Sequence, residues 1–199
     1  YLTSDHRLML EKPTEIIEGL KILMRILNVK KGYIGIEANK PDAVEAMKKA
    51  AAGSPDVEVW AVQVKYPQGA EKMLIEAVLG VEVPSGKLPL DVGVVVQNVA
   101  SAATIAEVFE TGMPLVERVV TVTGGGVRRP GNYVVPVGSK LSDVLAFCGG
   151  LTDDAREIVA YYANAIAQLD GDGLIGPRPQ PHPVGEPALV PLPLGEGRG

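Results

Sequence analysis

The sequence predicts an α/β fold built around a parallel or mixed sheet and followed by a small β-β-α module. Two apolar runs of strand length, at residues 32–37 and 57–64, are each followed by a segment with helical periodicity. This repetition of strand and helix is typical of right-handed crossover units. After Pro114 the pattern changes to two alternating strands, joined by a glycine-rich turn and followed by a short helix.

The first helix is predicted to begin at Pro13, because proline is favoured in a first helical turn. Its apolar residues recur at helical spacing and should lie on the sheet: Ile16, Ile17, Leu20, Leu23, Met24 and Leu27. After the strand at residues 32–37, Asn39 is the candidate N-cap of a second helix, which carries Pro41 in its first turn and extends to Ala51.

The strand at residues 57–64 leads through a short loop into a helix at residues 72–79. Residues 80–90 contain too much proline and glycine for a regular element. The apolar run at residues 92–96 is predicted to be a further strand of the sheet. A helix at residues 101–111 should follow, stop at Gly112, and bury an apolar face made of Ile105, Val108 and Phe109.

In the β-β-α module, strands are predicted at residues 116–123 and 133–137. The helix after them should be capped by Gly149 and Gly150, with an apolar face made of Leu141, Val144 and Leu145. The three glycines at residues 124–126 could form a hairpin turn or cradle a phosphate. We favour the hairpin, because the strand-loop-helix spacing of a phosphate loop is missing.

The sequence divides into an α/β domain at residues 1–114, the small module at residues 115–157, and a terminal segment at residues 158–199. We expect the terminal segment to hold a helix and then, after Gly171, a proline- and glycine-rich tail. Such a composition does not support regular structure, so we expect this tail to be disordered, or a vector-derived extension without function.

Composition narrows the possible functions. The chain has 199 residues, 46% of them hydrophobic, and a formal net charge of −5, which fits a soluble globular protein and disfavours nucleic acid as a partner. One cysteine, Cys148, and two histidines provide no metal site and no internal disulfide. The longest apolar stretch, residues 16–29, is interrupted by charges and too short to span a bilayer. A first residue other than methionine is expected of a fragment of a longer protein.

The most informative segment is the loop between the predicted strand and helix, with Lys65, Gly69 and Glu71. Glycine lets a backbone approach a ligand closely, and the first turn of a helix presents unpaired N–H groups to an anion. The loop therefore suits a phosphate-bearing cofactor. A strand-to-helix turn with a nearby lysine is also common as plain structure.

Five motifs, in this order, resemble the C subunit of Rnf electron-transport complexes: SDHRLM at 4–9, KYPQGAEK at 65–72, VQNV at 96–99, PLVERVVTVTG at 114–124 and PGN at 130–132. The resemblance extends from Tyr1 to about Val159. The Rnf protein is itself similar to the NADH-binding flavoprotein subunit of respiratory complex I. The resemblance implies a Rossmann-like FMN-domain core followed by a small β-grasp domain of the soluble-ligand-binding (SLBB) type.

The resemblance also implies a function: hydride transfer between NAD(H) and non-covalently bound FMN, which feeds iron-sulfur clusters in an NADH:ferredoxin oxidoreductase. The implied partners are the other subunits of an ion-translocating Rnf complex, with ferredoxin indirectly. The implied location is the cytoplasmic side of the bacterial cell membrane, reached through partner subunits only. In the family, a glycine-rich loop before the position of Tyr1 and cysteine motifs after the β-grasp domain complete the machinery. We therefore expect this chain alone to be inactive.

Four residues are implied to bind the cofactors: Lys65, Gly69, Glu71 and Asn98. Gly69 and Glu71 match the Gly and second Glu of the Gly-Glu-Glu signature in the complex I flavoprotein. Asn98 matches the second residue of its Asn-Asn pair, beside the FMN phosphate and ribityl chain. Ala70 replaces the first Glu of that signature, which puts identical nicotinamide placement in question, and Gln97 replaces the first Asn of the pair.

Each of these residues also has a purely structural interpretation. Glu71 is favoured at a helix start by the helix dipole, Asn98 can cap a helix, and Lys65 can be a solvated lysine. We interpret residues 5–7 as a salt-bridged lead-in to a helix. Two further functions stay open: a cobalamin reductase of the propanediol-utilisation type, which shares the same core, and a ligand-binding or assembly module without redox activity.

Overall fold

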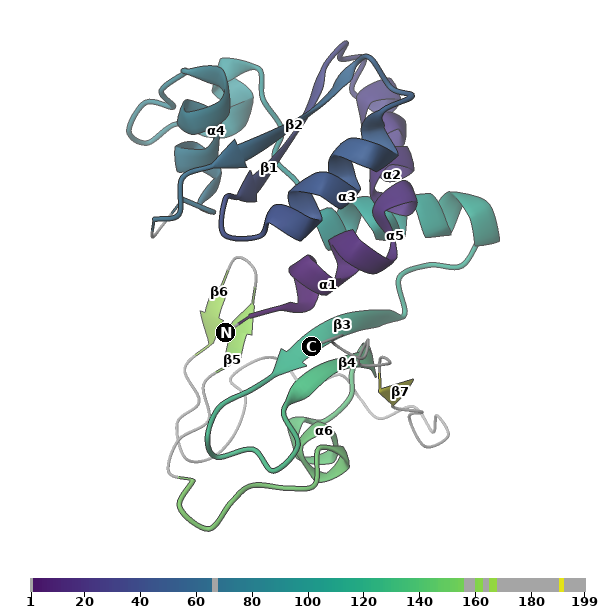
Figure 1. Cartoon of the computed structure of the whole chain (residues 1–199), viewed down its shortest axis with the longest axis vertical. Coiled ribbons are helices and arrows are strands. Elements are labelled where there is room, and N and C mark those ends of the chain that lie inside the picture. The colour runs from purple at the N-terminus through teal and green to yellow at the C-terminus, as the bar shows by residue number, and fades with distance from the viewer. Residues whose placement is uncertain (1, 66–67, 156–159, 163–164, 168–189, 192–199) are drawn as a thin grey trace. The chain divides into compact units, whose positions relative to one another are not determined.

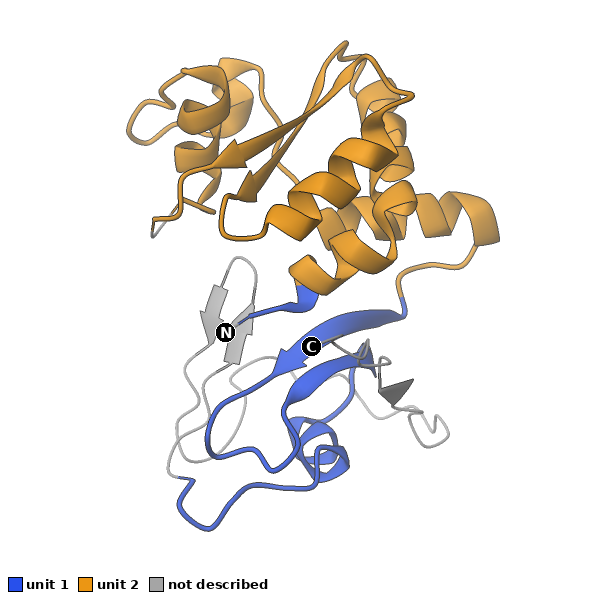
Figure 2. Cartoon of the chain, in the orientation of Figure 1, with its two compact units in different colours: residues 1–4, 116–199 blue, residues 5–115 orange. Residues whose placement is uncertain are grey.

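A computed structural model of the chain describes residues 2–65, 68–155, 160–162, 165–167 and 190–191 (Figure 1). The chain separates into two compact units, which Figure 2 shows in different colours. One unit is Asp5–Leu115, and the other comprises Tyr1–Ser4 and Val116–Gly199.

The larger unit contains the predicted succession of helices and strands. Its elements are α1 (Ser4–Glu11), α2 (Pro13–Ile26), β1 (Gly32–Glu37), α3 (Pro41–Ala51), β2 (Val57–Val62), α4 (Glu71–Leu79), the short 3-10 helix η1 (Pro89–Val92) and α5 (Val99–Thr111). Strands β1 and β2 are parallel, with Gly32 opposite Val57 and Glu37 opposite Val62. A parallel pair needs a crossover connection, and α3 supplies it. The predicted strand-helix-strand-helix pattern is therefore confirmed.

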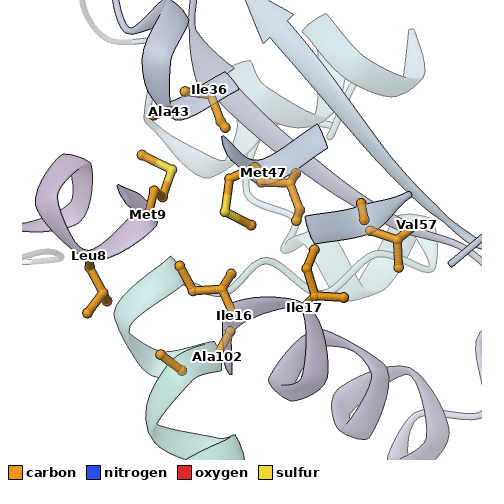
Figure 3. Close-up of a cluster of buried hydrophobic side chains, with 12 residues drawn as sticks. Leu8, Met9, Ile16, Ile17, Ile36, Ala43, Met47, Val57 and Ala102 are labelled. Atoms are coloured by element: carbon orange, nitrogen blue, oxygen red, sulfur yellow. The ribbon is translucent and has the colours of Figure 1, made fainter. Parts of the chain in front are cut away.

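The core of this unit lies where β1 and β2 meet the helices. Figure 3 shows buried side chains that α1, α2, α3, α5 and both strands contribute. Ile16 is 1% exposed and Met47 is not exposed at all. Burial of one such side chain is worth about 1.5–3 kcal/mol, so this cluster is the main reason for the layered arrangement.

Glycines allow two close contacts between the layers. A Cβ atom at Gly19 of α2 would lie 1.8 Å from the Ala102 carbonyl oxygen of α5, so the two helices meet backbone to backbone. A Cβ atom at Gly35 of β1 would lie 2.5 Å from Leu74 Cδ1 of α4. Because side chains alternate along a strand, α4 contacts the face of β1 opposite to that of Ile34 and Ile36, which are buried in the core cluster.

The contact at Gly19 explains why the predicted face of α5 is wrong. We predicted that Phe109 would be buried, but it is 67% exposed. The buried residues of α5 are instead Ala102, Ala103 and Ala106. A helix that approaches another this closely needs small residues at the contact, which hydrophobicity alone does not identify.

The predicted strand at residues 92–96 is also absent from the described structure. Val92 ends η1, and Gly93 follows with a left-handed φ of 74°. The Asp91 carboxylate accepts a hydrogen bond from the Leu88 N–H at 2.8 Å, which stabilises this turn. Residues 94–98 then pair with no strand in the described part of the chain.

The smaller unit is a β-hairpin with a helix. Strand β3 (Glu117–Val122) pairs with β4 (Gly131–Pro136) in antiparallel fashion, and α6 (Leu141–Phe147) follows. Its buried cluster comprises Tyr133, Val135, Val144 and Cys148. The predicted glycine cap is confirmed, because the Gly149 and Gly150 N–H groups donate to carbonyl groups of the last turn of α6.

Only short pieces of residues 158–199 are described, and they are strands. β5 (Ala160–Tyr162) pairs with β6 (Ala165–Ala167), and β7 (Val190–Pro191) pairs with β4. The predicted terminal helix is therefore wrong for residues 160–162 and 165–167. Tyrosine and isoleucine favour strands, and the helical interpretation ignored this preference. The rest of the predicted tail lies outside the described residues.

Candidate functional site

A buried amide holds the loop after β2. The Gln68 side chain is 2% exposed, and its Nε2 donates to the Met73 carbonyl oxygen in α4 at 3.2 Å. The Gln68 N–H donates to the Lys65 carbonyl oxygen at 2.7 Å. Gln68 could not be predicted from the sequence, because a polar residue in a proline- and glycine-containing loop carries no signal of burial. These bonds tie Gln68 to Lys65 and to the first turn of α4.

The N-terminus of α4 is open. Its N-cap, Ala70, has extended backbone (φ −66°, ψ 135°) and no side-chain cap. The first N–H groups of a helix have no partner inside the helix, so an uncapped end favours an anion. Lys65 and Glu71 are close in sequence to this helix start, and Glu71 is the first residue of α4. Both residues are exposed. The predicted helix start is confirmed to within one residue.

Gly69 is not required by the fold. Its φ is not in the left-handed region, and a Cβ atom added to it would meet no heavy atom of the described residues within 4 Å. A glycine with open space around it, directly before an uncapped helix, leaves room for a ligand at the backbone. The residues present in this loop therefore fit a phosphate-bearing group.

Asn98 caps α5. Its Oδ1 accepts the Ala100 N–H at 2.8 Å, and its Nδ2 donates to Asp5 Oδ2 at 2.7 Å. The capping role that we considered for Asn98 is thus confirmed. Because an amide has two N–H groups and two acceptor lone pairs, these bonds leave one of each for a ligand.

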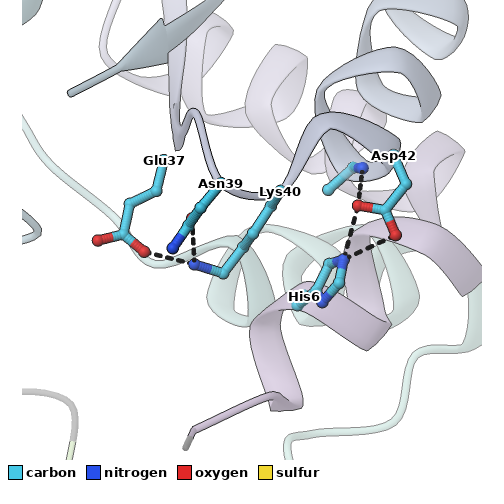
Figure 4. A network of polar contacts seen from close by, with 6 residues as sticks. His6, Glu37, Asn39, Lys40 and Asp42 are labelled. Carbon is cyan, nitrogen blue, oxygen red and sulfur yellow. Dashed lines mark hydrogen bonds and ion pairs between the residues drawn. The ribbon is translucent and has the colours of Figure 1, made fainter. Parts of the chain in front are cut away.

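The first turn of α1 contacts other helices. Asp5 binds Asn98 of α5, and His6 Nε2 lies 2.9 and 3.0 Å from the two carboxylate oxygens of Asp42 in α3 (Figure 4). Arg7 forms an ion pair with Glu11 within α1. The predicted salt-bridged lead-in is therefore confirmed for Arg7, whereas Asp5 and His6 hold α1 to its neighbours.

The hydrogen bond with His6 lowers the pKa of Asp42, and the Ala43 N–H, which donates to the same carboxylate at 2.8 Å, adds to this effect. Nearby, Lys40 forms an ion pair with Glu37 at the end of β1 and donates to Asn39 Oδ1 at 3.3 Å (Figure 4). The N-cap of α3 is Lys40, so the prediction of Asn39 is wrong by one residue. Asn39 instead helps to orient the lysine.

The structure joins only some of the predicted site residues. Lys65, Gly69 and Glu71 belong to one segment, from the end of β2 to the start of α4. Asn98 begins α5, and no hydrogen bond or ion pair found in the described residues links it to that segment. Convergence of Glu71 and Asn98 on one ligand stays a prediction.

The described residues show neither a metal-binding cluster nor a membrane-spanning helix. They contain no group of three or more histidine, cysteine, aspartate or glutamate residues placed to hold a metal ion. Within the same residues, no helix combines the length and apolar character needed to cross a bilayer.

Comparison with known proteins identifies both units. Residues 1–107 match the Nuo51 FMN-binding domain, and residues 119–165 match the SLBB domain. The chain therefore belongs to the family of the Nuo51 FMN-binding domain and carries an SLBB domain after it. The predicted α/β fold and the predicted soluble-ligand-binding module are confirmed.

The curated relatives of the chain point to one particular subunit, which the domain matches alone do not. The C subunit of the proton-translocating ferredoxin:NAD(+) oxidoreductase complex of Clostridium ljungdahlii is 49% identical over 160 residues, covering 80% of this chain and 35% of the relative. The C subunit of the Na(+)-translocating complex of Acetobacterium woodii is 45% identical over 160 residues, covering 80% and 36%. The C subunit of the ion-translocating oxidoreductase complex of Rhodobacter capsulatus is 43% identical over 160 residues, covering 80% and 31%. The chain is thus a homologue of the C subunit of Rnf complexes and spans about a third of the length of these relatives.

Among solved structures, the chain resembles part of an NAD+-reducing NiFe-hydrogenase crystallised in the air-oxidized state. The TM-score is 0.61 with 22% sequence identity, covering 74% of this chain and 30% of the other. This likeness supports the fold alone.

Proposed function

We propose that this chain is the FMN- and NADH-binding part of an Rnf-type C subunit, in an ion-translocating ferredoxin:NAD oxidoreductase complex. The observation that carries the proposal is the match of residues 1–107 to an FMN-binding domain, together with the names of the curated relatives. The complex is membrane-associated through its other subunits. Ferredoxin exchanges electrons with the complex and has no direct contact with this chain.

The loop after β2 has the properties that an FMN phosphate and a nicotinamide would need. Lys65 supplies a positive charge, and the uncapped start of α4 supplies N–H donors. The open space at Gly69 lets the ligand approach the backbone. Glu71 would position the nicotinamide of NADH, and the remaining N–H of Asn98 would donate to the phosphate or ribityl chain of bound FMN.

Bound FMN would accept a hydride from NADH and release electrons one at a time, which is chemistry that the protein itself cannot supply. The residues of this chain bind and orient the two cofactors. Near-attack placement of two reactants accounts for a large part of such rate enhancements. Cys148 is the only cysteine, so the iron-sulfur clusters that accept the electrons have their ligands outside this chain.

The test is FMN binding by the full-length protein and by its Gly69→Ala variant. A methyl group placed against a bound ligand should weaken FMN binding on the order of tenfold, since overpacking costs about 1–3 kcal/mol. The fold tolerates a Cβ atom at Gly69, so the thermal unfolding midpoint of the flavin-free protein should not fall.

Gly53→Ala is the matched control. Gly53 is also exposed, and a Cβ atom there also meets nothing within 4 Å. We expect wild-type FMN affinity for this variant. A full-length protein that binds no FMN would refute the proposal and favour a ligand-binding module without redox activity. Equal FMN affinities of the Gly69→Ala and Gly53→Ala variants would show that the loop after β2 is not part of the FMN site.

A further inference from the structure

One hydrogen bond joins two helix starts that are far apart in the sequence. Asn98 Nδ2, at the start of α5, donates to Asp5 Oδ2, in the first turn of α1, at 2.7 Å. Both side chains are half-buried. A short bond from an amide to a carboxylate is charge-assisted, and partial burial protects it from competing water.

This bond and the helix cap together fix the amide group of Asn98. The capping bond alone, from the Ala100 N–H to Oδ1, holds only the oxygen atom and lets the amide plane swing about it. The bond to Asp5 holds the nitrogen as well, so the plane is defined by two points. A carboxylate only accepts hydrogen bonds, so the amide cannot flip without losing both interactions.

The Asp5 carboxylate is well placed for this task. It lies in the first turn of α1, where the helix dipole stabilises a negative charge. It therefore stays available as an acceptor without needing a cationic partner. The adjacent residue, His6, contacts Asp42 of α3, so the same turn is also held from a second side.

We infer that Asp5 is a positioning residue for the cofactor site: it sets the plane of the Asn98 amide and aims its remaining N–H group at the ligand. The inference rests on the proposed function, in which Asn98 contacts FMN. Asp5 acts through Asn98 and does not touch the flavin itself. The Asp5 carboxylate would repel a phosphate, which agrees with a residue that contacts Asn98 and not the cofactor.

A double-mutant cycle in the full-length protein tests this inference. FMN dissociation constants are measured by quenching of FMN fluorescence for Asp5→Ala, Asn98→Ala and the double variant. Each single variant should weaken binding by about three- to tenfold, which is the value of one hydrogen bond. The double variant should bind no more weakly than Asn98→Ala, because Asp5 then has no amide to position.

Two further variants separate positioning from general support of the fold. Asp5→Asn keeps an acceptor oxygen for Asn98 and should restore FMN affinity to within about threefold of wild type. His6→Ala removes the neighbouring helix contact but not the bond to Asn98, so it should leave FMN affinity unchanged. Without flavin, the two side-chain N–H protons of Asn98 should give separate, slowly exchanging NMR signals that Asp5→Ala shifts and His6→Ala does not.

The outcomes distinguish the inference from the proposed function. If the effects of Asp5→Ala and Asn98→Ala multiply in the double variant, or if Asp5→Ala behaves like His6→Ala, the inference is wrong while the flavin site stands. If Asn98→Ala itself keeps wild-type FMN affinity, Asn98 is not a flavin contact, and the inference fails with it.

Discussion

Gly19 of α2 and Ala102 of α5 are in backbone contact: a Cβ atom at Gly19 would lie 1.8 Å from the Ala102 carbonyl oxygen. Helix α5 carries Asn98 at its start, so this contact sets how the capped end of α5 lies in the larger unit. The position has no room for any side chain.

We therefore expect Gly19→Ala to destabilise the larger unit, although alanine is the better helix former. Helices α2 and α5 must separate to admit the methyl group, and overpacking of this kind costs about 1–3 kcal/mol. For a chain of this size the thermal midpoint should fall by roughly 2–10 °C, measured by circular dichroism. Gly53→Ala, whose Cβ has open space, is the control. Equal midpoints for the two variants would contradict the packing described here.

Glu71→Gln should slow hydride transfer in the full-length protein while FMN stays bound. The change keeps the size of the side chain and removes its charge, so the nicotinamide would lose the positioning contact proposed for Glu71. Misplacement of this kind can cost on the order of a hundredfold in rate, measured as flavin reduction by NADH in a stopped-flow instrument. Glu76→Gln removes an exposed carboxylate from the same helix and should have no effect. A wild-type rate for Glu71→Gln would mean that the role assigned to Glu71 by resemblance to the family is wrong.

Asp42→Asn should remove a pH-dependent contribution to stability. The hydrogen bonds with His6 and the Ala43 N–H lower the pKa of Asp42 below its ordinary value of 3.8. A carboxyl group with a lower pKa in the folded state stabilises the fold above about pH 4, and this stabilisation is lost as the pH falls through the folded-state pKa. Because the Asp42 side chain is 53% exposed, we expect a contribution of about 0.5 kcal/mol.

Urea unfolding of wild type and Asp42→Asn at pH 7 and pH 3 measures this contribution. The difference in unfolding free energy should be present at pH 7 and should shrink at pH 3. His6→Ala should reproduce the loss, because it removes the main partner of the carboxylate. A difference that stays constant across this range would argue against the His6–Asp42 interaction in solution.

Tyr133→Phe should destabilise the smaller unit by about 0.5–1.5 kcal/mol, the value of one hydrogen bond. The Tyr133 hydroxyl donates to the Arg129 carbonyl oxygen at 2.7 Å, while the ring packs edge-on against Phe147 at 5.8 Å and would be retained. Urea unfolding at pH 7 gives the difference. The partly exposed Tyr33→Phe should change stability by less than about 0.5 kcal/mol.

The same pair of proteins should show a difference at alkaline pH. Burial raises the pKa of Tyr133 above its ordinary value of 10.0, and the neighbouring Cys148 adds to this effect. The folded state then holds this proton more tightly, so the resulting stabilisation is complete below pH 10 and is lost as the pH rises through the folded-state pKa. The stability of wild type should therefore approach that of Tyr133→Phe above about pH 10.

Local signals in the sequence were sufficient to predict most helices and strands of the fold. The strand predicted at residues 32–37 coincides with β1, and Pro13 and Pro41 begin α2 and α3 as expected. Gly112 takes the left-handed conformation that ends α5. Each of these features depends on residues within a few positions of one another, because capping, helix starts and alternation are local effects.

The errors arose where a distant residue decides the outcome. Residues 92–96 have the apolar character of a strand, but a strand exists only with a partner, and the turn at η1 and Gly93 uses the first part of this run. The hydrophobic residues of α5 predicted the wrong buried face, because a backbone contact with Gly19 selects alanines there. The single-residue error at the N-cap of α3 is of the kind that helix ends commonly produce.

By itself, the sequence determined the class of fold, the order of its elements and the family to which the chain belongs, since these depend on periodicity and on short ordered motifs. It also identified Lys65, Gly69, Glu71 and Asn98 as candidates through resemblance. Only the tertiary structure placed Asp5 against Asn98 and buried the Gln68 side chain. The physical reason is that hydrogen-bond partners 93 residues apart are chosen by how the helices pack, and packing depends on side-chain volumes throughout the core.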